Sequence, residues 1–278
     1  MEARNDAQPG KLVHPADLIQ PAELVHYAVE DGIATLTLDS PANRNALSQQ
    51  LVAELLGHLQ LAAAEAAAGV VRGILLSHTG KVFCAGADLS EASAPVEGGG
   101  GVEAGARDLV RILHTILTVP VPVIARVDGV ARAGGLGILG ACDMVVASTV
   151  ASFAFSEVRI GVAPAIISLT TMERMSSRPV SRYFLTGESF GAAEAQECGL
   201  ITCAAETLED ALAPLLAAIR LGSPQGLAES KKLANASMLA RLEAGAQEMT
   251  ELSTRLFRTA EAREGIRAFQ ERRPPAWH

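Results

Sequence analysis

Hydrophobic and polar residues recur with two different periods along the N-terminal part of the chain. The segment Gly32–Asp39 (GIATLTLD) alternates every second residue and is rich in β-forming side chains, which predicts a strand. The Ala/Leu/Glu-rich segment Ser48–Ala68 predicts a helix with Ser48 as its N-cap. Continuous apolar runs predict further buried strands at Val70–Ser77, Val121–Val127 and Asp143–Ala147. Strands that alternate with helices indicate an α/β core.

The pattern becomes almost wholly helical beyond Gly199. The predicted helices there are Leu208–Arg220, Pro224–Ala234, Ala240–Arg258 and Ala260–Glu271. We therefore expect a loose tail at residues 1–22, an α/β core at residues 23–203 and a helical C-terminal region at residues 204–278. The stretch Ala94–Gly105, with consecutive glycines from Gly98 to Gly101, predicts a flexible surface loop.

Composition and net charge limit the kinds of molecule that the protein is expected to bind. Hydrophobic residues make up 49% of the 278 positions, which is ample for a sizeable core. The net charge of −8 and the pI near 5.3 argue against nucleic acid or an anionic membrane as the main partner. A phosphate-bearing ligand would therefore depend on local Arg, Lys and backbone amides.

The cysteines and the N-terminal residues favour a cytoplasmic protein with reduced thiols. The four cysteines show no paired spacing, and the first twenty residues contain no apolar core of the kind that a secretory signal needs. The most apolar region, Val119–Ala147, is interrupted by charged residues and a proline, so it is not expected to span a bilayer as one helix.

Two glycine-rich stretches, Lys81–Glu91 (KVFCAGADLSE) and Gly129–Asp143 (GVARAGGLGILGACD), together predict an oxyanion hole. Each offers a backbone N–H that no bulky side chain screens, at Ala87 and at Gly134. Two such donors aimed at one oxygen can hold the charge that develops when a thioester becomes an enolate. Either stretch alone would be explained by a tight turn.

The segments FCAGADL, GG followed by ACD, and FAFSEVRIG resemble the crotonase (enoyl-CoA hydratase/isomerase) superfamily, from about Ile33 to Pro274. The resemblance implies an α/β fold built as a spiral of ββα turns, followed by helices that build a homotrimer or a dimer of trimers. It also implies an acyl-CoA thioester substrate, with coenzyme A as part of that substrate and no separate cofactor.

Glu157, within Phe153–Gly161, is the candidate acid/base. Its apolar neighbours would raise the pKa of the carboxyl and allow proton exchange near neutral pH. The alternative is an ordinary carboxylate paired with Arg159. The resemblance matches Glu157 to one of the two glutamates of enoyl-CoA hydratases, whereas Gly137 stands where the other would be. A glycine at that position is expected to open space beside the thioester.

The resemblance also implies contacts with coenzyme A around Arg44–Ala46 and Ala85–Ser90. The candidate binding residues are Arg44, Ala46, Ala85, Asp88, Leu89, Ser90, Gly137, Arg272 and Arg273. Members of the family often carry a lysine where Ser90 stands, so one phosphate contact is expected to be missing here. Arg272 and Arg273 resemble a basic pair that can reach coenzyme A, and the alternative is that they belong to a solvated tail. For Arg44 the same two alternatives, a contact with coenzyme A and a solvated side chain, are open.

Two other motif matches do not fit their usual context. The GxGxxG match at Gly135–Gly140 leads almost at once into a predicted strand instead of the long helix of a dinucleotide site. The GxSxG match at Gly187–Gly191 has only His278 downstream, so it is interpreted as a turn before the predicted helix Ala192–Cys198. The histidines show no ligand spacing, and His114 falls on the predicted helix Arg107–Leu117, so no metal site is expected.

The leading hypothesis is therefore an enzyme that hydrates a 2-enoyl-CoA. A single carboxylate suits the movement of a proton between carbons, so a 3-enoyl-CoA to 2-enoyl-CoA isomerase that uses Glu157 is an alternative that is chemically almost as good. A crotonase-fold protein that binds acyl-CoA without turnover is the alternative from another class.

Overall fold

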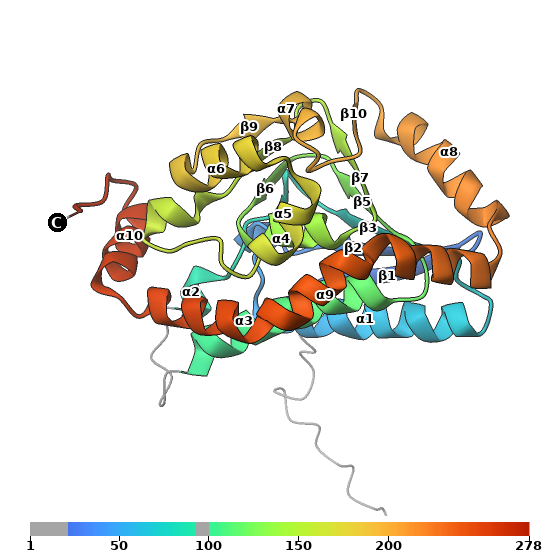
Figure 1. The fold of residues 1–278 in the computed structure, drawn as a ribbon, viewed down its shortest axis with the longest axis horizontal. Coiled ribbons are helices and arrows are strands. Elements are labelled where there is room, and N and C mark those ends of the chain that lie inside the picture. The colour runs from blue at the N-terminus through green and yellow to red at the C-terminus, as the bar shows by residue number, and fades with distance from the viewer. Residues whose placement is uncertain (1–21, 93–99, 278) are drawn as a thin grey trace, which may run out of the picture.

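The computed structural model describes residues 22–92 and 100–277, which form an α/β fold with two mixed sheets (Figure 1). The six-stranded sheet has the order β1-β2-β3-β5-β7-β10. Its strands are β1 Val25–Glu30, β2 Ile33–Leu38, β3 Gly73–His78, β5 Val123–Val127, β7 Met144–Ser148 and β10 Cys203–Ala205. The strands predicted at β2, β3, β5 and β7 are confirmed, with boundaries shifted by up to three residues.

The six-stranded sheet begins with a hairpin that the sequence analysis did not separate from β2. β1 pairs antiparallel with β2, and Asp31 and Gly32 connect them with φ angles of 48° and 75°. An Asp-Gly pair with both φ values positive is the usual two-residue hairpin turn. The remaining pairings of this sheet are parallel.

Helices cover both faces of this sheet, as parallel strands require. On one face, α1 (Gln49–Ala67) and α3 (Gly100–Thr118) pack over the main core, with α9 (Pro224–Phe257) against α3. On the other face, α8 (Leu208–Leu221) buries Leu212 and Ile219 against Ile33, Ile124 and Val146. Ser48 caps α1 as predicted, because its hydroxyl accepts from the N–H of Leu51.

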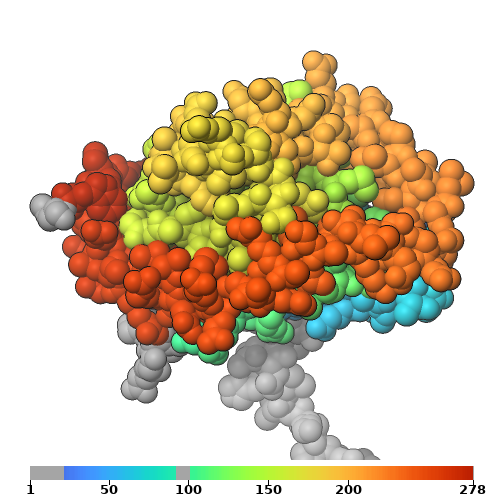
Figure 2. Space-filling model, viewed as in Figure 1, coloured from blue at the N-terminus to red at the C-terminus, as the bar shows by residue number. Residues whose placement is uncertain are grey.

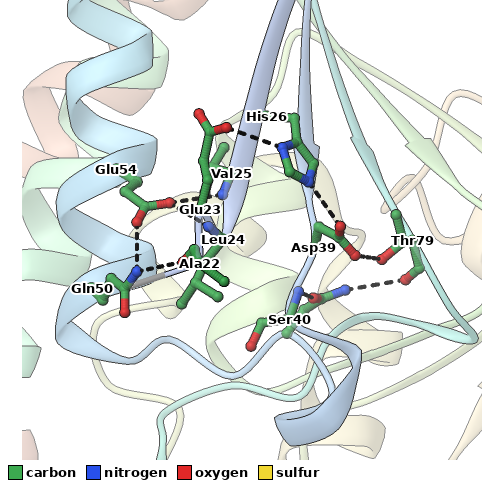
Figure 3. A network of polar contacts seen from close by, with 11 residues as sticks. Ala22, Glu23, Leu24, Val25, His26, Asp39, Ser40, Gln50, Glu54 and Thr79 are labelled. Carbon is green, nitrogen blue, oxygen red and sulfur yellow. Dashed lines mark hydrogen bonds and ion pairs between the residues drawn. The ribbon is translucent and has the colours of Figure 1, made fainter. Parts of the chain in front are cut away.

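Figure 3 shows a polar network that fixes the start of β1 and the loop after β2. Glu54 on α1 accepts the backbone N–H groups of Leu24 and Val25. His26 on β1 lies 2.8 Å from Asp39, which also accepts from Thr79. These contacts hold the N-terminal strand and the residues that follow β2 to the same part of the core.

The second sheet has four short strands in the order β4-β6-β8-β9. They are β4 Val82–Cys84, β6 Val130–Arg132, β8 Ser152–Ala154 and β9 Phe190–Gly191. The first three pair in parallel, so their carboxyl ends meet at one edge of the sheet. The remaining elements are η2 Pro41–Asn43, α2 Leu89–Ala92, α4 Gly134–Ala141, η3 Ser156–Ile160, α5 Ser168–Arg174, α6 Ser177–Thr186, α7 Ala192–Glu197 and α10 Ala260–Gln270.

The structure corrects the prediction of two helices at Pro224–Ala234 and Ala240–Arg258. They are one helix of 34 residues, α9, which crosses the lower part of the face shown in Figure 2. Asn235 and Met238, in the stretch between the predicted helices, are buried. Asn235 donates to Asp143 and accepts from Arg174, so tertiary contacts hold the helix continuous there.

The loop predicted at Ala94–Gly105 is also corrected, because α3 already begins at Gly100. The glycines after that point are helical because the following turns bury Ala106, Ile112 and Leu113 in the core. Residues 94–99 of that segment and residues 1–21 of the tail expected at 1–22 lie outside the described residues. Within the described residues, no helix combines the length and apolar character needed to cross a membrane.

Candidate active site

Three candidate segments leave the same edge of the second sheet. Ala87 follows β4, Gly134 follows β6 and Glu157 follows β8. The register pairs Cys84 with Ala131 and Arg132 with Ala154, so the three carboxyl ends are nearly level. Because neighbouring strands lie about 4.8 Å apart, the segments emerge side by side. Carboxyl ends of parallel strands are where α/β sheets commonly build their sites.

The two segments with the candidate oxyanion donors are in direct contact. A Cβ atom placed on Gly86, where φ is +92°, would lie 2.8 Å from the Ala133 Cβ and 3.4 Å from the Gly134 nitrogen. A Cβ on Gly134 would lie 3.6 Å from the Gly86 Cα. Gly86 therefore permits a backbone approach that a side chain at this position would prevent, whereas the distance from a Cβ on Gly134 to Gly86 is an ordinary contact.

Both candidate N–H groups are free of internal acceptors. Gly134 is the first residue of α4, whose first N–H groups have no partner within the helix. Across residues 22–92 and 100–277, neither the Ala87 nor the Gly134 N–H donates to a protein acceptor. Ala133, just before α4, has φ at +46°, a strained angle that turns the chain into this helix.

Leu47 joins these segments, and the sequence analysis missed it. Its N–H donates to the Gly86 carbonyl over 2.8 Å, and it forms a parallel β-bridge with Ala87. Its Cδ1 lies 3.0 Å from where a Cβ of Gly134 would be. Nothing in the local sequence signals this role, because the contacts join residues at least 39 positions apart.

The preceding loop is shaped by two left-handed residues, Arg44 and Asn45, with φ angles of 62° and 51°. Asn45 is fully buried and bonds to Ser40, Thr79 and Val82. In this conformation the Arg44 carbonyl accepts a hydrogen bond from the Ala85 N–H at 3.1 Å. The expected binding segments Arg44–Ala46 and Ala85–Ser90 are therefore adjacent.

Glu157 lies in the short 3-10 helix η3 with only 8% of its surface exposed. Its Oε2 atom is buried and has no hydrogen-bond partner among the described residues. Burial raises the pKa of this carboxyl to about 7. The alternative pairing with Arg159 does not form, since the Arg159 Nε donates to the Thr186 carbonyl.

The open space expected at Gly137 is absent. A Cβ at this buried position would lie 2.5 Å from the Ile167 Cγ2 and 3.0 Å from the Ile167 Cβ. Ile167 precedes α5, which packs closely against α4. An apolar side chain thus fills the volume into which a side chain at Gly137 would point.

The acidic and polar residues after Ala87 form a helix cap. Asp88 accepts from the Ser90 N–H at 2.9 Å and from the Ser90 hydroxyl, and Asn43 donates to its second oxygen. These hydrogen bonds hold the pKa of the Asp88 carboxyl below its usual value although burial opposes them. Ser90 is exposed, Leu89 is partly buried and Ala46 is buried.

The two arginines of the basic pair near the C-terminus have different surroundings. Arg273 binds both carboxylate oxygens of Glu264, at 2.6 and 3.0 Å, and also contacts Glu271. These bonds lower the pKa of Glu264 to about 2. The Arg273 guanidinium is therefore occupied within the chain, whereas Arg272 is exposed.

The GxGxxG and GxSxG matches belong to ordinary secondary structure. Gly135–Gly140 lies inside α4, and Gly187 is the left-handed C-cap of α6. His114 is exposed on α3, 3.6 Å from Glu243, and lines a surface groove of about 350 Å³ between α1, α3 and α9. No cluster of three His, Cys, Asp or Glu side chains suited to a metal occurs within the described ranges.

The family model for enoyl-CoA hydratase/isomerase matches residues 28–278. The chain belongs to this family. It is an enzyme of the enoyl-CoA hydratase type with the crotonase fold, and the family implies an acyl-CoA substrate.

Solved and curated relatives agree with this assignment. The crystal structure of an enoyl-CoA hydratase from Mycobacterium avium is 47% identical with a TM-score of 0.83, covering 93% of this chain and 100% of that one. The 2,3-dehydroadipyl-CoA hydratase of Escherichia coli is 31% identical over 87% of this chain and 94% of its own length. The zebrafish (Danio rerio) enoyl-CoA hydratase domain-containing protein 3, mitochondrial, is 31% identical over 89% of this chain and 85% of its own length.

Proposed function

We propose that this enzyme binds the thioester oxygen of an enoyl-CoA between the N–H groups of Ala87 and Gly134 and transfers a proton with Glu157. One observation carries the proposal. A buried carboxyl with one unpartnered oxygen follows the same sheet edge as two backbone N–H groups that have no acceptor among the described residues.

The chemistry of each group follows from its surroundings. Two N–H donors stabilise the negative charge that moves onto the thioester oxygen when the enolate forms, and one such donor contributes roughly 3 kcal/mol to lowering the barrier. A carboxyl with a pKa of about 7 populates both protonation states near neutral pH, so Glu157 can both accept and donate a proton.

Hydration of a 2-enoyl-CoA is the leading reaction. Glu157 accepts a proton from water as the hydroxyl adds to C3, the electron pair moves onto the thioester oxygen, and the proton returns to C2. The names of the relatives from M. avium and E. coli support this reaction.

Isomerisation of a 3-enoyl-CoA to a 2-enoyl-CoA is the second candidate, favoured by Ile167. With this apolar side chain filling the volume next to Gly137, that part of the site offers no second carboxyl to hold a water. Glu157 would then remove a proton from C2 and return it to C4 through the same enolate.

The coenzyme A contacts and the assembly are part of the proposal. We infer that coenzyme A lies along Arg44, Ala46, Leu89, Ser90 and Arg272, because the first four are close to the two donors and Arg272 is exposed. Homotrimers or dimers of trimers built through residues 204–278 are the proposed assembly, and light scattering of the purified protein tests it.

The products formed in oxygen-labelled water decide between the reactions. Purified protein is incubated separately with 2-enoyl-CoA and 3-enoyl-CoA, and the thioesters are separated by chromatography, because the two isomers have equal mass, and then followed by mass spectrometry. A labelled 3-hydroxyacyl-CoA supports hydration, whereas an unlabelled 2-enoyl-CoA formed only from the 3-enoyl substrate supports isomerisation. Calorimetric binding of straight, branched and aromatic enoyl thioesters without turnover would refute both and leave a binding protein.

A further inference from the structure

The short helix η3, which carries Glu157, is held between two other helices by close backbone contacts. On one side lies α10, at the opposite end of the molecule from α8 (Figure 1). A Cβ on Gly265 of α10 would lie 2.5 Å from the Ile160 carbonyl carbon and 2.6 Å from its oxygen. No side chain at position 265 is compatible with this contact.

The contact is reciprocal. A Cβ on Gly161, where φ is +76°, would lie 2.7 Å from the Glu261 carbonyl carbon and 2.8 Å from the Ala262 nitrogen. On the other side of η3, a Cβ on Gly187 would lie 2.9 Å from the Val158 Cγ1. Glycines on three elements thus let α6 and α10 enclose the turn that bears the acid.

Both ends of α10 are fixed. The Thr259 hydroxyl accepts from the Ala262 N–H at 3.1 Å and caps the first turn. At the other end, Glu264 binds Arg273 and accepts the Ala276 N–H at 2.9 Å. These contacts keep α10 folded against η3 although it is the last helix of the chain.

Ile160 lies one turn of a 3-10 helix beyond Glu157, so both residues lie on the same side of η3. A helix that touches the Ile160 backbone therefore packs against the turn that bears Glu157, whose carboxyl is buried. We propose that Gly265 is a positioning residue for Glu157: by admitting the α10 backbone against η3, it holds this turn in place and shields the carboxyl from bulk solvent on the α10 side. This inference rests on the proposed role of Glu157.

Charged side chains of the surrounding helices are engaged elsewhere and do not account for the state of Glu157. Arg159 bonds to Thr186, Arg182 of α6 to Glu188, and Glu264 of α10 to Arg273. Glu261, Arg263 and Arg267 on α10 are exposed. Burial is the cause that raises the pKa of Glu157, so its titration reports on water at η3.

The test is a Gly265→Ala substitution in the full chain, with the carboxyl of residue 157 titrated directly by infrared difference spectroscopy. Glu157→Gln identifies the band of this carboxyl. Gly57→Ala is the matched control, since a Cβ at Gly57 on α1 would meet nothing within 4 Å. The added methyl at position 265 must displace α10 from η3, so water should reach the carboxyl.

We expect the titration midpoint of Gly265→Ala to fall by at least about one pH unit toward the ordinary glutamate value, with Gly57→Ala unchanged. An unchanged midpoint in folded Gly265→Ala protein overturns the inference, even if turnover or KM changes. If Gly265→Ala does not fold, Thr259→Ala, which only weakens the cap of α10, should shift the midpoint in the same direction; an unshifted midpoint refutes the inference. A shifted midpoint in a protein that turns over no enoyl thioester would contradict the proposed function alone.

Discussion

At the scale of single residues, the surroundings of Glu157 favour catalysis at a cost in stability. Its carboxyl is buried and its Oε2 atom has no partner among the described residues, which is costly for the charged form and useful for proton transfer near neutral pH. Natural proteins keep such groups where they act on a substrate. Activity and stability should therefore respond in opposite directions to its removal.

Glu157→Gln should lower kcat/KM by about 10²–10⁴-fold, because a neutral amide cannot exchange the proton. It should also remove the pH dependence with an apparent pKa near 7. Steady-state kinetics across a pH series measure both effects. Glu173→Gln is the matched control, since Glu173 on α5 bonds to Ser237 and Arg241 and to no other side chain among the described residues. Retention of near-normal activity by Glu157→Gln would refute the proposed role.

The pH dependence of stability should change in the same variant. The folded pKa of Glu157, about 7, lies above the ordinary 4.5, so the native state binds more protons between these values and the free energy of unfolding falls as pH rises through them. The full shift corresponds to about 3 kcal/mol as an upper bound. Urea unfolding at pH 4.5 and pH 8 should show this decline in the native chain and a smaller one in Glu157→Gln; equal declines would contradict it.

At the scale of elements, the small residues of α4 decide how closely its neighbours approach. Ile167 lies against Gly137, and the Thr170 hydroxyl donates to the Gly137 carbonyl at 2.9 Å. The contact fixes the helix whose first N–H is the candidate donor at Gly134. Sequence alone indicated the glycines but not the residues that fill the space beside them.

Gly137→Ala should destabilise the fold by about 1–3 kcal/mol, because the new methyl overlaps Ile167. Adding Ile167→Ala removes the Cγ2 atom that overlaps most closely, so the double variant should lose less stability than the sum of the two single variants. Urea unfolding of all four proteins gives the coupling energy. Strictly additive losses would show that the two side chains do not share this volume.

At the scale of the whole molecule, one buried lysine joins the C-terminal helices to the α/β core. Lys231 on α9 donates to the carbonyls of Ile116 and Val121 and forms an ion pair with Asp143 at 2.8 Å. Asp143 also accepts from Val123 and Asn235, so the buried charge is fully satisfied. Burial lowers the pKa of Lys231 although Asp143 opposes that shift.

Lys231→Ala should destabilise the protein by about 3–5 kcal/mol, since it leaves the Asp143 carboxylate without its cation. The adjacent Lys232→Ala is the control, because Lys232 is exposed and contacts only Glu229. Thermal or urea unfolding compares the two variants. Similar small losses for both would mean that Lys231 does not anchor α9.

The sequence by itself determined the α/β class, the positions of β2, β3, β5 and β7, the Ser48 cap and the family, because periodicity, caps and short motifs are local properties of the chain. It also indicated Ala87, Gly134 and Glu157 as separate residues. Only the tertiary structure placed the segments that carry them at one edge of the same sheet, through parallel pairing of β4, β6 and β8. The same holds for the continuity of α9, for Ile167 beside Gly137 and for the ion pairs that occupy Arg273. Each of these depends on contacts between residues distant in sequence or on competition among charged partners, which a pattern along one chain does not encode.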